Sequence, residues 1–127
     1  MLDEWANRGA TTKEYEKLSN TISKETFGVT TQEHKELKNV ADGSLRDNIS
    51  QMELLITSLA ELTTSELHKN NNSQGLDELN ADAIKGGQAA SFARQQIETT
   101  LGKPVLTAEN AINFTQPLLT TKEKAPK

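Results

Sequence analysis

Apolar residues recur along much of the chain at spacings of three and four, which is the period of an amphipathic α-helix. The first such segment starts at residue 11 or 12, carries Tyr15, Leu18 and Ile22, and ends before Gly28, a natural left-handed cap. A shorter helix is predicted from about residue 31 to residue 38. Both segments start with the Thr-x-x-Glu spacing of a capping box, at Thr11 with Glu14 and at Thr30 with Glu33.

The strongest apolar pattern predicts a central helix over residues 51–68. Ser50 followed by Glu53 indicates a third capping box at its start. The apolar face expected to be buried consists of Met52, Leu55, Ile56, Leu59, Thr63 and Leu67, widened by Leu54 and Leu62. The polar run that follows, from Asn70 to Gly75, predicts a loop.

A second long helix, predicted over residues 77–101, has an interior rich in glycine and alanine and ends at Gly102. Because glycine inside a helix costs about 0.5–1 kcal/mol relative to alanine, another contact should offset that cost. A stripe of small residues allows a second helix to approach closely, either from the same chain or from a second protomer. The predicted helix-packing or oligomer interface is made of Gly86, Ala90, Ala93, Ile97, Leu55 and Leu59.

Strand-forming residues are scarce, with three phenylalanines, one tyrosine and one tryptophan in 127 residues. The sequence therefore predicts an all-α fold, a compact domain of about four to five helices that spans residues 1–114. Thr107 is a candidate cap for a last short helix at about 108–114. Residues 115–127 are expected to form a flexible tail, since glutamine, threonine, lysine and proline dominate there.

Composition limits the classes of protein that fit this chain. Only 34% of the residues are apolar, so the core must be thin. The absence of cysteine excludes disulfides, thiolate metal sites and cysteine nucleophiles, and no apolar run is long enough to span a membrane. We expect a soluble, cytoplasmic protein without a membrane partner. A net charge of −4 gives no overall positive field that would attract nucleic acid.

The candidate chemistry of the sequence is sparse. The two histidines, His34 and His68, lie on different predicted helices without a chelating partner at the i, i+4 spacing, so no metal site is predicted. The pair Gly86-Gly87 lacks the preceding strand and the following Lys-Ser/Thr of a phosphate loop. We expect a protein without a cofactor and without enzymatic activity; an enzyme using a carboxylate pair would require a pocket holding two acids with strongly perturbed pKa values.

Basic residues offer two interpretations. Arg46, Asp47 and Asn48 are expected to form a fixed polar turn at the entrance to the central helix. The alternative is a nucleic-acid contact through phosphates by Lys85, Arg94 and Lys103, joined by Arg46. Interleaved acids and the lack of stacking aromatic residues favour the structural interpretation.

An ordered set of short motifs connects the chain with a known family. These motifs are EWANRG at 4–9, TTQEHKELK at 30–38, SLRDNI at 44–49, EL at 53–54, LAELTTSE at 59–66, GGQAA at 86–90, AR at 93–94, IE at 97–98 and LGKPV at 101–105. Over residues 4–114 the order and spacing resemble the region that follows the BRO N-terminal domain in bacterial and prophage proteins related to DNA-damage-inducible protein D and phage antirepressors. The segment 40–43 departs from the basic turn of relatives.

The resemblance implies the C-terminal module of a longer regulator whose DNA-associated BRO domain is not part of this chain. We therefore expect a non-enzymatic protein-interaction or oligomerisation module from a damage-inducible or antirepressor-type regulator. By resemblance, its partner is a repressor or a recombination protein, and a homodimer is a second expected assembly. A nucleic-acid-binding accessory domain is the alternative.

Overall fold

The computed structural model describes residues 1–39, 45 and 49–107, and within this part the chain forms five α-helices and no strand. The helices are α1 (Leu2–Asn7), α2 (Thr12–Phe27), α3 (Thr31–Lys38), α4 (Gln51–Asn71) and α5 (Gly75–Leu101). The predicted all-α class is confirmed. The expected helix at 108–114, the tail at 115–127 and the polar turn of Arg46, Asp47 and Asn48 lie outside the described residues.

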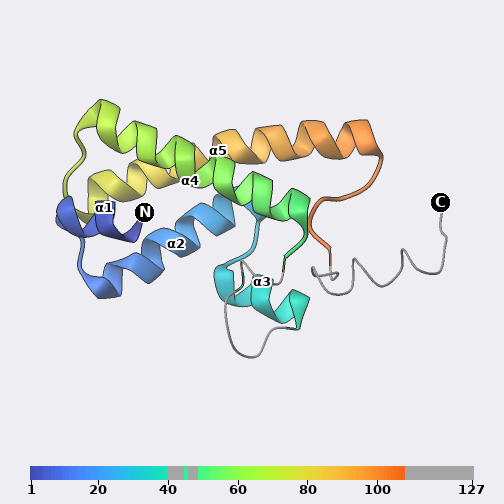
Figure 1. Ribbon diagram of the computed structural model, residues 1–127, viewed down its shortest axis with the longest axis horizontal. Helices are drawn as coiled ribbons and strands as arrows, with labels where there is room; N and C mark the ends of the chain where they lie inside the picture. Colours follow the sequence, from blue (N-terminus) through green and yellow to red (C-terminus); the bar gives the residue numbers. More distant parts are fainter. Residues whose placement is uncertain (40–44, 46–48, 108–127) are drawn as a thin grey trace.

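The two longest helices, α4 and α5, run antiparallel, and α2 packs against both of them (Figure 1). The short helix α1 lies near the turn between α4 and α5. There the Gly75 N–H donates to the Arg8 carbonyl at 2.8 Å, and the Arg8 guanidinium donates to the Ser73 carbonyl at 3.3 Å. Helix α3 lies below the α2, α4 and α5 layer in this view.

The helix ends follow local capping chemistry at most positions. The capping boxes at the starts of α2 and α3 are both present, and Gly28 and Gly102 adopt the left-handed conformation that ends α2 and α5. At the start of α4, Ser50 accepts the Glu53 N–H, but the Glu53 side chain turns inward to His34. The predicted third capping box is therefore only half formed.

The connection between α4 and α5 is shorter than predicted. Helix α4 continues to Asn71, so the expected loop from Asn70 to Gly75 shrinks to residues 72–74. Asn72 ends α4 in the left-handed conformation, with φ of 49°, which asparagine tolerates better than most residues. The Asn71 side chain donates to Asp82 at 3.0 Å, and this contact favours the extra turn.

Helix α1 was not predicted, because six residues are too short to show a helical period. Its Trp5 is buried and joins the hydrophobic core. The core otherwise consists of Ala10, Leu18, Ile22, Phe27, Ile56, Ala60, Leu79, Ala83, Ala90 and Val105.

The buried face of α4 differs from the predicted one. The side chains turned inward are Glu53, Ile56, Ala60, Thr64 and His68, whereas Leu55 and Leu59 are exposed to solvent. The reason is the close approach of α5: a Cβ added at Gly86 would lie 2.0 Å from Thr64 Oγ1 and 2.9 Å from the Thr64 nitrogen. Leucines do not fit between helices that approach so closely, so α4 turns its alanine and threonine positions toward α5.

Candidate functional site

A row of exposed leucines runs along the outer side of α4. Leu55, Leu59 and Leu62, which we call the leucine face, are 59%, 39% and 63% exposed. At about 100° per residue they point away from the buried stripe of the same helix. Together with half-buried Met52 they repeat at spacings of three, four and three, which is the seam pattern of paired helices.

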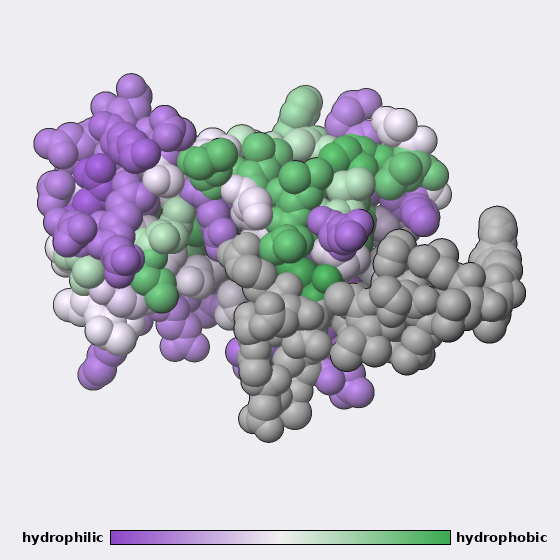
Figure 2. Space-filling model, viewed as in Figure 1, coloured by the Kyte–Doolittle hydropathy of each residue, from purple (hydrophilic) through white to green (hydrophobic). Residues whose placement is uncertain are grey.

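Hydrophobic surface is concentrated on two helices. Figure 2 shows it over α4 and the C-terminal half of α5, while the end that carries the α4–α5 turn is hydrophilic. Among the described residues, five of the seven exposed large hydrophobic side chains belong to these helices: Leu55, Leu59, Leu62, Phe92 and Leu101. Contiguous apolar surface of this kind commonly marks an interaction site.

The predicted stripe of small residues serves contacts inside the chain. Gly86 and Ala90 are buried, and Ala93 and Ile97 are half-buried. The neighbouring Gly87 faces α2, because a Cβ there would lie 2.5 Å from the Glu25 Cβ. The interface predicted from Gly86, Ala90, Ala93, Ile97, Leu55 and Leu59 is therefore divided: the small residues meet helices of the same chain, and the two leucines face outward.

Of the basic residues predicted as an alternative phosphate site, Arg46 lies outside the described residues, and Lys85 and Arg94 lie nine positions apart on α5, on opposite sides of that helix. Arg94 is engaged in the structure: its Nε donates to the Thr26 carbonyl at 2.8 Å, and its Nη1 donates to both carboxylate oxygens of Glu98 at 2.9 and 3.0 Å. This bonding ties α5 to the end of α2 and leaves the guanidinium poorly placed for phosphate. Lys85 and Lys103 are exposed.

A buried network of hydrogen-bonded side chains links α1, α4 and α5. The Trp5 indole N–H donates to His68 Nε2 at 3.1 Å, and His68 Nδ1 lies 2.9 Å from Asp82 Oδ2. Because an indole N–H only donates, Nε2 must accept, and the ring proton lies on Nδ1 and is donated to Asp82. Asp82 also accepts from Ser73 and Asn71. The side chains of Trp5, His68, Asp82 and Ser73 are all buried and hydrogen-bonded to one another, which is the arrangement of a structural network.

Two carboxylates around this network carry altered acidity. Burial pushes the pKa of Asp82 upward, but hydrogen bonds from Ser73, His68 and Asn71 outweigh it and hold the pKa below the usual aspartate value. Burial acts in the same upward direction on Glu4. There the hydrogen bonds from Ser65 at 2.6 Å and Arg8 at 3.2 Å dominate and lower the pKa. The hydrogen bonds therefore favour the ionised form of both carboxyl groups.

A second buried polar cluster joins α3 to α4. The Oε1 atom of Glu53 lies 2.9 Å from His34 Nε2, and the Oε2 atom accepts a hydrogen bond from the Lys38 ammonium. All three side chains are at most 2% exposed. The Thr107 N–H also reaches Glu53 Oε2, at 3.4 Å. Buried ionic groups of this kind fix the position of a helix, and α3 is attached to α4 at this point.

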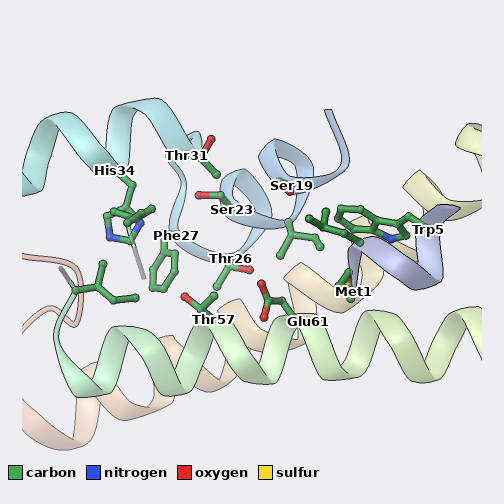
Figure 3. A pocket seen from close by; sticks show the side chains of 14 residues that line it. Met1, Trp5, Ser19, Ser23, Thr26, Phe27, Thr31, His34, Thr57 and Glu61 are labelled. Carbon is green, nitrogen blue, oxygen red and sulfur yellow. The ribbon is translucent and has the colours of Figure 1, made fainter. Parts of the chain in front are cut away.

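A pocket of about 410 Å³ opens between α1, α2, α3 and α4. Figure 3 shows Trp5 and Met1 at one end and Phe27 with His34 at the other, with Thr57 and Glu61 rising from α4. Its lining combines apolar side chains with hydroxyl groups. Sequence patterns did not predict this pocket, because its walls come from four separate helices and no local spacing connects them.

No group of three or more metal-ligating side chains is present among the described residues, and none of the described helices is long and apolar enough to cross a membrane. The two histidines are instead each paired with a buried carboxylate, Glu53 for His34 and Asp82 for His68. Sequence reasoning missed both pairs, since the partners are 19 and 14 residues apart.

Comparison with known proteins gave no relative: no family model, no curated protein and no solved structure matches this chain.

Proposed function

We propose that this chain is a protein-interaction module that associates with a second copy of itself through the leucine face of α4. The observation that carries the proposal is the exposure of Leu55, Leu59 and Leu62 at the spacing of a helix seam. A thin core gains stability when a second protomer covers such a surface. The resemblance to the region that follows the BRO domain supports a role in a DNA-damage-inducible or antirepressor-type regulator.

The extent of the leucine face defines the expected contact. Beyond Leu62, the same side of α4 continues with Glu66 and Lys69, which form an exposed ion pair at 3.5 Å. The apolar part therefore covers about two turns and ends in charged residues. This arrangement, an apolar centre with a polar rim, is typical of protein interfaces.

The test is molar mass by light scattering across a concentration series. The variant carries Leu55→Gln with Leu62→Gln, and the matched control carries Leu2→Gln with Leu37→Gln, two other exposed leucines, on α1 and α3. We expect the wild type and the control to dimerise and the α4 variant to remain monomeric with unchanged helical circular dichroism. A wild type that stays monomeric at every concentration, or an α4 variant that still dimerises, overturns the proposal.

A further inference from the structure

Trp5 attaches the short helix α1 to α4. Its side chain is 2% exposed, and its indole N–H donates to Nε2 of His68, which is fully buried. Two further polar contacts hold the helix: Ser65 donates to Glu4 at 2.6 Å, and Arg8 donates to the Ser73 carbonyl. A helix of six residues has little stability of its own, so its docking depends on contacts of this kind.

The hydrogen bond from Trp5 requires a neutral His68. An indole N–H is a donor only, so Nε2 must offer its lone pair, while the Nδ1–H donates to Asp82 at 2.9 Å. A second ring proton would have to bind at Nε2, where it would point at the indole N–H, one donor against another. The docked position of Trp5 is therefore incompatible with a protonated His68.

The charged groups around His68 decide how readily the ring takes up that proton once Trp5 has left. Asp82 contacts the ring directly, and its negative charge favours the protonated form. Hydrogen bonds hold the pKa of Asp82 and of Glu4 below the usual values, so both carboxylates are ionised in weakly acidic solution. Arg8 is paired with Glu4 at 3.2 Å.

Other ionisable groups lie further from the ring. Tyr15 of α2 packs beside the indole, with ring centroids 6.1 Å apart, and a phenol is uncharged at neutral and acidic pH. The Met1 amino group lies one turn before Trp5 on α1. On α4 itself, Lys69 is exposed and paired with Glu66, so solvent screens its charge. Asp82 therefore has the most direct influence on the proton affinity of His68.

We propose that the docking of α1 is sensitive to acid: uptake of one proton at His68 Nε2 releases Trp5, and α1 leaves the α4–α5 turn. The undocked form binds the proton that the docked form excludes, so the undocked population rises as pH falls. Because one proton is taken up, the ratio of undocked to docked α1 rises by at most about tenfold for each pH unit.

The release has a defined place and pH range. Histidine is the side chain whose ordinary titration falls between about pH 5 and pH 8, so the transition is expected there. Trp5 and Met1 line one end of the pocket, and the departure of α1 uncovers that end (Figure 3). The groups involved belong to one protomer, so the proposal does not depend on self-association.

Quenching of Trp5 fluorescence by acrylamide measures the release, since Trp5 is the only tryptophan of the chain. Acrylamide is uncharged, so its own state does not change with pH. Between about pH 8 and pH 5.5 we expect the quenching constant to rise by at least about threefold. Far-UV circular dichroism should stay nearly constant over this range, because α2, α4 and α5 remain folded.

The decisive variant is His68→Gln, whose amide still donates and accepts but does not titrate. Its quenching constant should be the same at both ends of the pH range. The matched control is His34→Gln, which removes the other histidine, on α3 beside Glu53, and should keep the pH response of the wild type. If His68→Gln does not fold, nitrogen NMR of the wild type replaces it. The His68 ring should then carry its proton on Nδ1 at about pH 8, and the indole N–H signal should change with the same midpoint as the ring signals.

Four results would overturn the proposal. The first is a quenching constant that does not change over this pH range, and the second is an unaltered pH response in folded His68→Gln. The third is loss of far-UV circular dichroism at the same midpoint as the exposure of Trp5, which reports unfolding of the whole molecule. The fourth is a neutral His68 ring whose proton lies on Nε2.

Discussion

Asp82 is held in the interior by three side-chain donors, from His68, Ser73 and Asn71. Replacing it by asparagine keeps the shape but presents an amide N–H₂ group to those donors. We expect Asp82→Asn to lower the free energy of unfolding by about 2–4 kcal/mol in urea titrations followed by Trp5 fluorescence. The matched control is Asp77→Asn in the exposed first turn of α5, which should cost at most about 1 kcal/mol. Equal losses of unfolding free energy in the two variants would mean that the buried Asp82 stabilises the protein no more than an exposed aspartate does.

The lowered pKa values of Asp82 and Glu4 make stability depend on pH in one direction. Between its folded and unfolded pKa, such a carboxylate is protonated in the unfolded chain and ionised in the native one. The unfolded state therefore binds more protons, and stability rises with pH. This contribution is fully present well above the unfolded aspartate pKa of about 3.9 and is lost as pH falls through the folded pKa.

We accordingly expect the free energy of unfolding of the wild type to fall steadily below about pH 5. In Asp82→Asn the slope should be shallower, because one of the carboxylates with a lowered pKa is gone. The measurement is urea unfolding at a series of pH values at fixed ionic strength. Parallel slopes for the two proteins would show that Asp82 does not couple folding to proton uptake.

At the scale of the elements, the crossing of α4 and α5 depends on the missing side chain at Gly86. A Cβ there would lie 2.0 Å from Thr64 Oγ1 and 2.9 Å from the Thr64 backbone nitrogen, and the backbone contact cannot be relieved by a side-chain rotation. Gly86→Ala should therefore lower the free energy of unfolding by about 2 kcal/mol or more, despite the gain of about 1 kcal/mol in helix propensity.

The control for this substitution is Gln88→Ala, at an exposed position two residues further along α5. It should change the free energy of unfolding by no more than a few tenths of a kcal/mol. Thermal unfolding followed by circular dichroism distinguishes the two. A stabilised Gly86→Ala protein would show that α4 and α5 do not approach each other as closely as the structure places them.

Capping residues made most helix boundaries predictable from the sequence. The side of α4 that is buried could not be predicted in this way. Capping residues and left-handed glycines act within a few residues of sequence, so the starts and ends of α2 and α3 could be derived directly. Which side of α4 faces inward depends on Gly86 and Thr64, 22 positions apart, and on the space their side chains leave. Hydrophobicity alone assigned Leu55 and Leu59 to the interior and overlooked the buried Glu53 and His68.

The candidate site was predictable only in part for the same reason. The spacing of Leu55 and Leu59 identified them as interface residues, and their exposure leaves that expectation open to test. The pocket depends on Trp5, Phe27 and Thr57, which lie on three separate helices and line its walls. Nothing in the local sequence encodes how these helices pack against one another. Function predicted from a periodic pattern is therefore limited to surfaces formed by one helix.

At the scale of the whole molecule, the helices differ in how they are held. Helix α5 packs extensively against α2 and α4, whereas α3 lies apart from that layer, contacts α2 through Phe27 and His34, and meets α4 through the buried cluster of Glu53, His34 and Lys38 (Figure 1). A helix held by few contacts, several of them buried and polar, is expected to open more readily than one held by a continuous apolar seam. The stability of α3 should then depend on Glu53 more strongly than that of α5 does.

Hydrogen exchange measured by mass spectrometry tests this difference with Glu53→Gln. The substitution removes the negative charge that the Lys38 ammonium and His34 contact between α3 and α4, so amides of α3 should exchange at least about tenfold faster, while those of the α5 interior change much less. The control is Glu66→Gln, on an exposed position of the same helix, which should leave both helices unchanged because its ion pair with Lys69 is solvent-exposed. Uniform acceleration across α3 and α5 would instead show that the cluster stabilises the molecule as one cooperative unit, and unchanged exchange in α3 would show that the cluster does not hold this helix in place.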